Sequence, residues 1–395
     1  LESHHRWVGE WYGRSVAVKD ALSLLATKTC AMPSTRAEVQ PGASQTVAVS
    51  VGGDVSCASS LHSMQLTLEL VQLLVAASTP VQVVALSRGA LVPSAAHGGL
   101  WGVTRVLQLE HSMLRARIMD ASRSTNATAA PTLVSETAET EVVWRCKSPY
   151  AARLRALESI SMPGKRLMRA TYVITGGLGG LGLRAAALLI GRTSSRVLLA
   201  SRSGRIARNA QGQEEQLFLA LKLVADAVAC DSADASDTRA LLSRTPPTCV
   251  LHAAGVGGRA LLVHLEAQWM QHMFAAKASG AWHLHSVLKA SALELCVLFS
   301  SGAAIGFRKQ GSYAAANASV DAHSVLRRAQ GMAACSMQWP GVSGAGMGVG
   351  WTNEVAALQA QHSSLAGASG VVFISLETYA ACVGAQLAAS VGLGL

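Results

Sequence analysis

The chain alternates short apolar runs with longer amphipathic ones over its first third. Short runs rich in Val predict strands, and longer runs with apolar side chains at helical spacing predict helices. In chain order the pattern predicts a strand at 46–51, a helix at 60–77, a strand at 81–86, a helix at 97–111 and a strand at 116–119. This βαβαβ order is typical of a parallel sheet flanked by helices.

A second alternation of the same kind begins at Tyr172. It predicts strands at 172–175, 196–200 and 293–299, and a strand that runs into a small-residue turn within 249–256. It also predicts a helix at 269–288, a helix that begins at Tyr313, and a last strand and helix within 371–387. The polar residues 207–216 predict a loop. The repeat of the alternation predicts a second subdomain of the same class.

The expected fold class is therefore α/β, with two Rossmann-like doubly wound parallel-sheet subdomains. We expect the first over residues 1–165, with an irregular lead-in at 1–35, and the second over residues 166–395, because Pro163 and Gly164 punctuate the chain between them. Gly52-Gly53-Asp54 follows the first predicted strand without GxGxxG spacing, so a cofactor loop is expected only in the second subdomain.

Composition narrows the class of protein. The chain has 395 residues, 50% of them hydrophobic, which is enough for two domain-sized cores. No apolar run reaches the ~18 residues of a membrane span, and the first residues lack the form of a signal peptide. We expect no membrane span and a location in the cytoplasm or an organelle stroma. Because the chain does not begin with Met, we expect it to be a piece of a longer polypeptide.

Charge and cysteine content exclude further classes. The formal net charge is +10, but Lys and Arg are dispersed and only 5% of residues are aromatic, which disfavours nucleic acid as a partner. An acidic protein partner or a phosphorylated cofactor fits the basic balance. The eight Cys are scattered with no CxxC pair, which predicts reduced thiols and no metal site.

A glycine-rich turn joins the strand at 172–175 to a following helix. Its residues are Thr175, Gly176, Gly177, Leu178, Gly179, Gly180, Leu181 and Gly182. Glycine lets the backbone adopt positive φ and lets a pyrophosphate approach the amide groups at a helix start, where the helix dipole favours negative charge. Alone, this pattern is equally compatible with an ordinary strand–turn–helix connection.

Residues after three other predicted strands fit the same nucleotide. Ser201 and Arg202 end the second strand, where the adenosine ribose of a dinucleotide lies, and a cation there favours the 2′-phosphate of NADPH. Asp231 follows Cys230 at a further predicted strand end. Ala253, Ala254 and Gly255 leave room for a flat ligand.

Four residues downstream can carry proton chemistry. Tyr313 and Asn317 lie four residues apart, so a helix places them on one face. A phenol is a poor acid at neutral pH unless a cation stabilises its phenolate, and Lys277 is a candidate for that cation. A serine after the strand at 293–299 can hold a carbonyl oxygen while Tyr313 donates a proton to it.

These motifs together resemble the ketoreductase domain of modular type I polyketide synthases, in the short-chain dehydrogenase/reductase superfamily. The resemblance rests on residues 175–182, Leu251-His252-Ala253-Ala254-Gly255-Val256 and Tyr313-Ala314-Ala315-Ala316-Asn317-Ala318. Leu298-Phe299-Ser300-Ser301 and Ser336-Met337-Gln338-Trp339 are similar to further family motifs, and 100–111 resembles a helix of the family's structural subdomain.

The resemblance implies a function and a set of roles. It implies NADPH-dependent reduction of a β-ketoacyl thioester, carried on an acyl carrier protein within a multidomain synthase, to the β-hydroxyacyl thioester. Lys277, Ser301, Tyr313 and Asn317 would form the active-site tetrad, Arg202 would bind the 2′-phosphate and Asp231 would lie at the adenine. Residues 351–364 would form a helix of a lid over the substrate.

The sequence departs from the family pattern at two places. Ser300 stands 13 and Ser301 stands 12 residues before Tyr313, and the family spacing is 13, although the position after the strand favours Ser301. Gly257-Gly258-Arg259 replaces the Leu-Asp-Asp fingerprint of one product hand, and Ile305 stands where a Trp would mark the other. The configuration of the product is therefore unreadable, and a catalytically silent scaffold domain is the alternative function.

Overall fold

The computed structural model describes residues 35–40, 46–51, 57–76, 81–88, 97–121, 138–145, 148–153, 170–193, 195–206, 212–347 and 373–390. The predicted boundary at Pro163 and Gly164, the Gly52-Gly53-Asp54 turn and the predicted lid helix at 351–364 lie outside these residues. Contacts between Cα atoms divide the chain into two units. The first combines residues 1–156 with 258–274 and 303–326, and the second combines 157–257 with 275–302 and 327–395.

The sheet of the first unit has six strands among the described residues. They are β1 (Thr35–Gln40), β2 (Thr46–Val51), β3 (Gln82–Arg88), β4 (Arg117–Ala121), β5 (Glu141–Arg145) and β6 (Ser148–Tyr150), in that order across the sheet. The pairs from β2 to β4 are parallel, as predicted. Strand β5, which was not predicted, also pairs parallel with β4. The edge strands β1 and β6 are antiparallel to their neighbours and were not predicted.

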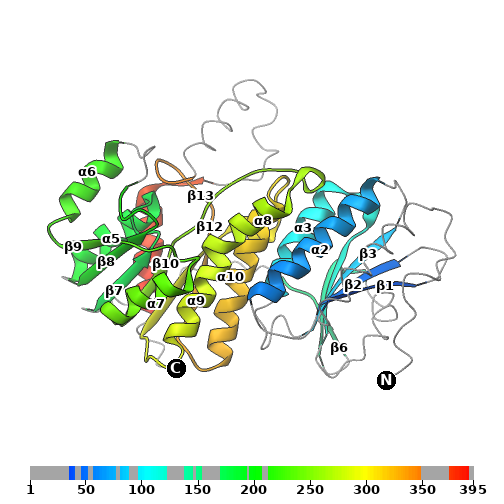
Figure 1. Ribbon diagram of the computed structural model, residues 1–395, viewed down its shortest axis with the longest axis horizontal. Coiled ribbons are helices and arrows are strands. Elements are labelled where there is room, and N and C mark those ends of the chain that lie inside the picture. The colour runs from blue at the N-terminus through cyan, green and yellow to red at the C-terminus, as the bar shows by residue number, and fades with distance from the viewer. Residues whose placement is uncertain are drawn as a thin grey trace. The chain divides into compact units, whose positions relative to one another are not determined.

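Helices that lie wholly or mostly in the first unit come from three parts of the chain. They are α2 (Cys57–Ala76), α3 (Gly98–Glu110), the 3-10 turns η2 (Ser112–Leu114), η4 (Leu262–His264) and η6 (Gly302–Ile305), α8 (Ala267–Phe274) and α10 (Gly311–Ala329). Helices α2 and α3 pack against each other, and α3 contacts β3 and β4 (Figure 1). The predictions of α2 and α3 are confirmed to within three residues at each end.

The second unit contains a fully parallel sheet. Its strands are β7 (Thr171–Thr175), β8 (Arg196–Ser201), β9 (Ala225–Ala229), β10 (Cys249–His252), β11 (Leu295–Ser301) and β12 (Cys335–Trp339), and their order is β12-β11-β10-β7-β8-β9. All five neighbouring pairs run parallel. This is the doubly wound arrangement, in which the order reverses between β7 and β10, and it confirms the predicted fold class.

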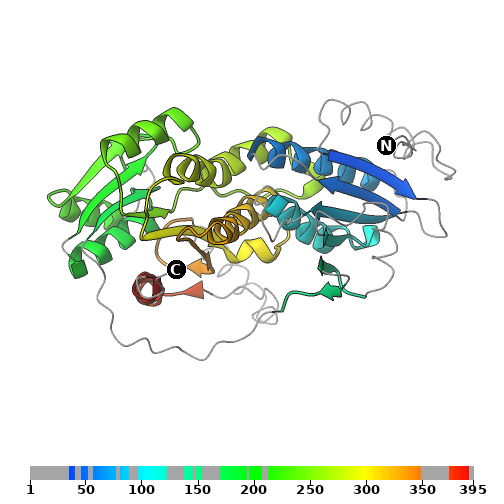
Figure 2. The same cartoon turned by 90° about the horizontal axis from the view of Figure 1, so that it is seen from below.

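Helices cover both faces of this sheet. They are α5 (Gly180–Thr193), α6 (Gly212–Leu221), α7 (Ala235–Arg244), the π-helical turn η5 (Ala275–Ser279), α9 (Gly280–Leu288) and α12 (Leu376–Ser390), with a short pair β13 (Gly341–Val342) and β14 (Phe373–Ile374). One core joins the sheet to α5 and α12, and another joins it to α7 and α9. Figure 2 shows α12, in red, across the sheet from α9.

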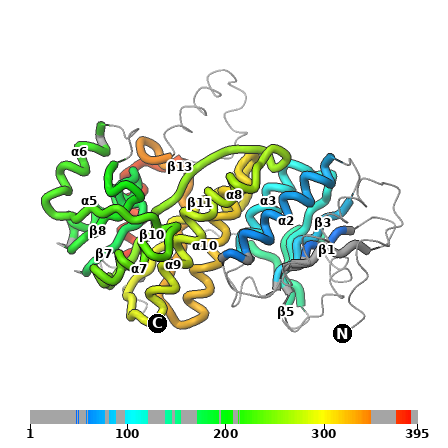
Figure 3. The backbone as a smooth tube through the Cα atoms, in the orientation of Figure 1, coloured from blue at the N-terminus to red at the C-terminus, as the bar shows by residue number. Residues whose placement is uncertain are grey.

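The structure sets the exact bounds of three predicted elements. The loop predicted at 207–216 is wrong from Gly212 onward, because α6 begins there with Glu214 and Glu215 in the helix's first turn, where acidic groups are favourable. The strand predicted to run into a turn within 249–256 ends at His252, where its pairing with β7 ends, and the small residues Ala253, Ala254 and Gly255 follow it as predicted. The helix predicted at 269–288 begins at Ala267 with α8 and continues to Leu288 in α9 (both labelled in Figure 3). The π-helical turn η5 lies between these two helices.

Candidate active site

Strands β7 and β10 mark the point where the strand order of the second unit reverses. Thr175 and His252 pair at their carboxyl ends. In open parallel sheets, ligands bind in the crevice outside these ends at the reversal point. The glycine-rich turn follows Thr175, and the Ala253-Ala254-Gly255 turn follows His252. Both segments predicted to bind the cofactor therefore leave the sheet at this point.

The glycine-rich turn has no room for side chains at its critical positions. Gly176 has φ +68°, and a Cβ there would lie 2.5 Å from the backbone nitrogen of Ala254. A Cβ on Gly182 would lie 2.4 Å from the carbonyl oxygen of Gly176, so the first turn of α5 packs closely on the loop. Gly179 is exposed directly before α5 begins. This exposed backbone at a helix start fits the pyrophosphate of a dinucleotide.

The turn after β8 is shaped by backbone bonds. The amides of Gly204 and Cys230 both donate to the carbonyl oxygen of Ser201, at 3.1 and 2.8 Å. Arg202 lies exposed in this turn. Asp231 has a structural task as well, because its carboxylate accepts the Ala233 N–H at 3.0 Å. These contacts hold the segments where the adenosine part of a dinucleotide is expected.

Lys277 lies in the π-helical turn η5 and is 3% exposed. Its Nζ donates to the carbonyl oxygen of Phe299 at 2.7 Å, near the carboxyl end of β11. A Cβ on Gly255 would lie 2.7 Å from the Lys277 Cε, so the lysine stem passes directly over the turn that follows β10. The structure thus brings Lys277 to the same sheet edge as the cofactor turns.

The two candidate serines are both in β11. Ser300 is buried, while Ser301, the last residue of the strand, is half-buried. Neighbouring strand residues point to opposite faces, so only one of the two can face a given ligand. The choice of Ser301 stays a prediction.

Tyr313 and Asn317 lie on α10, in the first unit. Asn317 is fully buried, and its Nδ2 donates to the carbonyl oxygen of Tyr313 at 2.8 Å, one turn earlier. Tyr313 is half-buried. The predicted sharing of one helix by these two residues is confirmed. The tetrad is divided between the units, with Lys277 and Ser301 in the second.

Comparisons with known proteins agree on one family. Residues 170–344 match the model of the KR domain. The chain is 35% identical over 306 residues to polyketide synthase GfsA from Streptomyces halstedii, which covers 72% of this chain and 4% of that synthase. It is 37% identical over 265 residues to the pikromycin polyketide synthase component PikAIII from Streptomyces venezuelae, covering 64% of this chain and 17% of that protein.

Among solved structures, a structure of A-type ketoreductases from a modular polyketide synthase superposes with a TM-score of 0.71. The two sequences are 29% identical, and the superposed region covers 83% of this chain and 71% of the other. The chain belongs to the polyketide synthase ketoreductase domains. These are members of the short-chain dehydrogenase/reductase superfamily, so the recognised resemblance is confirmed. The ketoreductase chain spans less than a fifth of the length of the two curated relatives named above.

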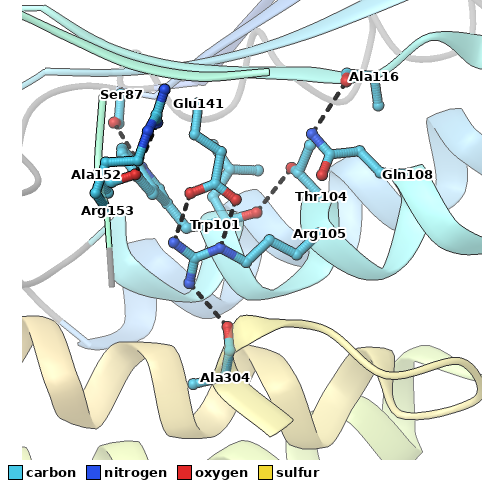
Figure 4. Close-up of polar contacts among 11 residues, drawn as sticks. Ser87, Trp101, Thr104, Arg105, Gln108, Ala116, Glu141, Ala152, Arg153 and Ala304 are labelled. Atoms are coloured by element: carbon cyan, nitrogen blue, oxygen red, sulfur yellow. Dashed lines mark hydrogen bonds and ion pairs between the residues drawn. The ribbon is translucent and has the colours of Figure 1, made fainter. Parts of the chain in front are cut away.

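Two charged residues of this domain that were not predicted as functional hold the segments leading to α10. Arg105 on α3 pairs with the Glu141 carboxylate through Nε and Nη2, each at 2.7 Å (Figure 4). Its Nη1 donates to the carbonyl oxygen of Ala304 at 2.8 Å. Glu110, at the end of the same helix, accepts the backbone N–H groups of Leu262 and Lys309, at 2.7 and 2.5 Å. Helix α3 thereby fixes the residues just before Tyr313.

In the sheet of the first unit, a buried tryptophan lies at the carboxyl ends of two strands. Trp101 is 6% exposed and donates from Nε1 to Ser87 Oγ at 3.1 Å, and Ser87 donates to the Asp120 carboxylate at 2.8 Å. A packed indole thus lies at the carboxyl ends of β3 and β4. This position fits the predicted structural role of the first subdomain.

The described residues of this domain hold neither a metal-binding cluster nor a membrane-spanning helix. Within them, no group of three His, Cys, Asp or Glu could hold a metal ion. No helix in the same ranges is long and apolar enough to cross a membrane. Free thiols are carried by Cys230, Cys249, Cys296, Cys335 and Cys382.

Proposed function

We propose that this domain reduces a β-ketoacyl thioester, carried on an acyl carrier protein, to the β-hydroxyacyl thioester with NADPH as reductant. The observation that carries the proposal is the junction of the glycine turn, the Gly255 turn and Lys277 at the reversal point of the second sheet. Ketoreduction is the chemistry of the family, and a glycine-rich turn with a buried cation beside it at one sheet edge supports that chemistry here.

In this proposal each residue of the predicted tetrad has a separate role in the reaction. When bound, NADPH supplies a hydride to the carbonyl carbon. Tyr313 donates its phenolic proton to the carbonyl oxygen, and the Ser301 hydroxyl holds that oxygen by a hydrogen bond. The Lys277 ammonium favours the phenolate left on Tyr313, because a nearby positive charge lowers the pKa of a phenol. Asn317 orients the turn of α10 that carries Tyr313, because its side-chain Nδ2 donates a hydrogen bond to the carbonyl oxygen of Tyr313.

Substrate delivery is expected from neighbouring domains. The curated relatives are synthases many times longer than this chain, which supports a place within a multidomain polypeptide. The net charge of +10 suits an acidic carrier protein as the donor of the acyl chain.

The test is a turnover assay with the whole chain, NADPH and a β-ketoacyl thioester or a surrogate cyclic ketone. We expect NADPH oxidation that forms the hydroxy product, resolved by chirality on a chiral column. Tyr313→Phe should lower kcat at least about a hundredfold, because it removes the proton donor and keeps the ring. NADPH binding and melting temperature should stay as in the wild type.

Two outcomes would contradict the proposal. NADPH binding without turnover in the wild type would favour the silent scaffold, which the changed serine spacing supports. Unchanged kcat in Tyr313→Phe would remove Tyr313 from the proton-donor role.

A further inference from the structure

The π-helical turn that carries Lys277 presents two backbone carbonyls to side chains from other elements. The carbonyl oxygen of Lys277 lies 2.8 Å from His252 Nε2, at the end of β10. The preceding carbonyl, of Ala276, accepts the Ser232 hydroxyl at 3.4 Å. A π-helical turn often marks a functional position inside a helix. Here the Lys277 carbonyl oxygen of the π-helical turn is hydrogen-bonded to the side chain of His252, the last residue of β10.

The contacts of His252 fix which of its ring nitrogens carries the proton. A backbone carbonyl only accepts hydrogen bonds, so Nε2 must donate to Lys277. Nδ1 is then unprotonated and accepts the hydroxyl of Thr175, whose Oγ1 lies 2.6 Å away. His252 is fully buried, and burial lowers its pKa to about 4. The ring is therefore neutral at assay pH, as this pattern of bonds requires.

The space for the imidazole is provided by a glycine. A Cβ on Gly280 would lie 2.8 Å from His252 Cε1, so α9 can pass close to the ring only because residue 280 has no side chain. Lys277 is held at its other end by the Phe299 carbonyl, which accepts from Nζ. Its backbone and its ammonium group are thus fixed by two neighbouring strands, β10 and β11.

We propose that His252 is a positioning residue that couples the cofactor turn to Lys277, through the continuous chain of hydrogen bonds from Thr175 to His252 to the Lys277 carbonyl. This inference rests on the proposed catalytic role of Lys277. Thr175 was predicted as a cofactor ligand. In this chain of hydrogen bonds its buried side chain, which is 2% exposed, contacts His252.

The test replaces the imidazole with a ring that cannot form hydrogen bonds. His252→Phe should lower kcat on the order of tenfold, because Lys277 is no longer held where it supports Tyr313 as the proton donor. The KM for the thioester should stay within about twofold of the wild-type value, because the substrate contacts are unchanged. In the reverse, NADP⁺-dependent oxidation, Tyr313 must be ionised, and a displaced Lys277 supports the phenolate less. The midpoint of the alkaline rise in kcat should therefore move to higher pH.

A second readout does not depend on activity. Lys277 is nearly buried, so a water-soluble amine-acylating reagent should label it slowly in the wild type and faster in His252→Phe, measured by peptide mass spectrometry. If the wild type lacks turnover, the proposed function fails, and this labelling still decides the positioning role. Thr175→Val keeps the imidazole and removes only the hydroxyl, so it should shift both readouts in the same direction by less.

The matched control is His285→Phe. His285 is a second buried histidine of the same unit, lies on α9 and contacts Arg327 at 3.2 Å. It should lose stability like His252→Phe and keep the wild-type alkaline midpoint and Lys277 labelling. The inference is overturned if His252→Phe keeps both wild-type values, or if His285→Phe shifts them equally. If His252→Phe does not fold, Thr175→Val decides, and wild-type values in it would overturn the inference.

Discussion

Lys277 is hydrogen-bonded at both ends, through its carbonyl oxygen to His252 Nε2 and through its Nζ to the carbonyl oxygen of Phe299. The glycine spacing and the small turn after β10 could be predicted, because each reports a local need for backbone without side chains. The hydrogen bond from His252 to the Lys277 carbonyl could not, since it joins two positions 25 residues apart and depends on a non-α turn. The sequence marked Lys277 as a cation on a helix, and only the structure shows how tightly it is held.

Arg202 offers a test of cofactor choice at the same scale. Arg202→Ala should raise the KM for NADPH about tenfold, because a charged hydrogen bond to the 2′-phosphate is lost from an exposed site. The KM for NADH should stay within about twofold. Steady-state kinetics with both cofactors measure the two values.

Arg196→Ala is the matched control for Arg202. Arg196 is an exposed arginine at the opposite end of β8, paired with Asp226 at 3.3 Å. It should leave both KM values unchanged. If Arg202→Ala raised the KM for NADPH and the KM for NADH equally, Arg202 would have no role in binding the 2′-phosphate.

At the scale of elements, α10 depends on α3 for its position. A Cβ on Gly98 would lie 2.5 Å from the carbonyl oxygen of Ala318, and one on Gly102 would lie 2.4 Å from that of Ala314. Residues four apart share a helix face, so two glycines of α3 meet two alanines of α10 with their backbones almost in contact. The sequence predicted both helices, but their contact joins distant segments and has no local signal.

This contact predicts that the smallest side chain is too large at residue 102. Gly102→Ala should destabilise the protein by about 1–3 kcal/mol, because backbone atoms must move apart to admit the methyl group. The melting temperature should fall by several degrees, and kcat should fall because Tyr313 precedes the displaced Ala314. Calorimetry and the turnover assay provide the two measurements.

Gly191→Ala is the control for the same substitution in a helix. A Cβ on Gly191 in α5 meets nothing within 4 Å, so alanine there should raise stability by up to about 1 kcal/mol. Equal effects of the two substitutions would mean that α3 and α10 tolerate separation.

For the whole molecule, two buried histidines link stability to pH. Burial is the largest cause that lowers the pKa of His252 and of His285 to about 4, from an ordinary 6.5. In the unfolded chain both rings bind protons below 6.5, whereas in the folded chain they do so only near 4. Their contribution to stability is therefore complete above pH 6.5 and is lost as pH falls from 6.5 to 4.

The expected result is a free energy of unfolding that falls between pH 7 and pH 4.5, by on the order of 3 kcal/mol per histidine at most. Urea unfolding at several pH values measures it. His285→Phe should flatten part of the slope. A flat profile in the wild type would show that neither ring gains a proton on unfolding.

The division of the chain into units was the part of the fold least visible in the sequence. Alternating strands and helices predicted two sheets, and the structure contains them. Segment 258–274 and segment 303–326 belong with the first sheet although they follow the start of the second, because their partners are Glu110 and Arg105. The subdomain boundary near residue 165 stays a prediction, since long-range contacts rather than local punctuation decide membership.

The close packing of α3 on α10 also bears on engineering by recombination. A graft that starts at the glycine turn would carry α10 without Gly98 and Gly102, and would leave the small-residue face of that helix open to water. Transplanting this domain into another protein therefore requires the N-terminal sheet and its helices as well.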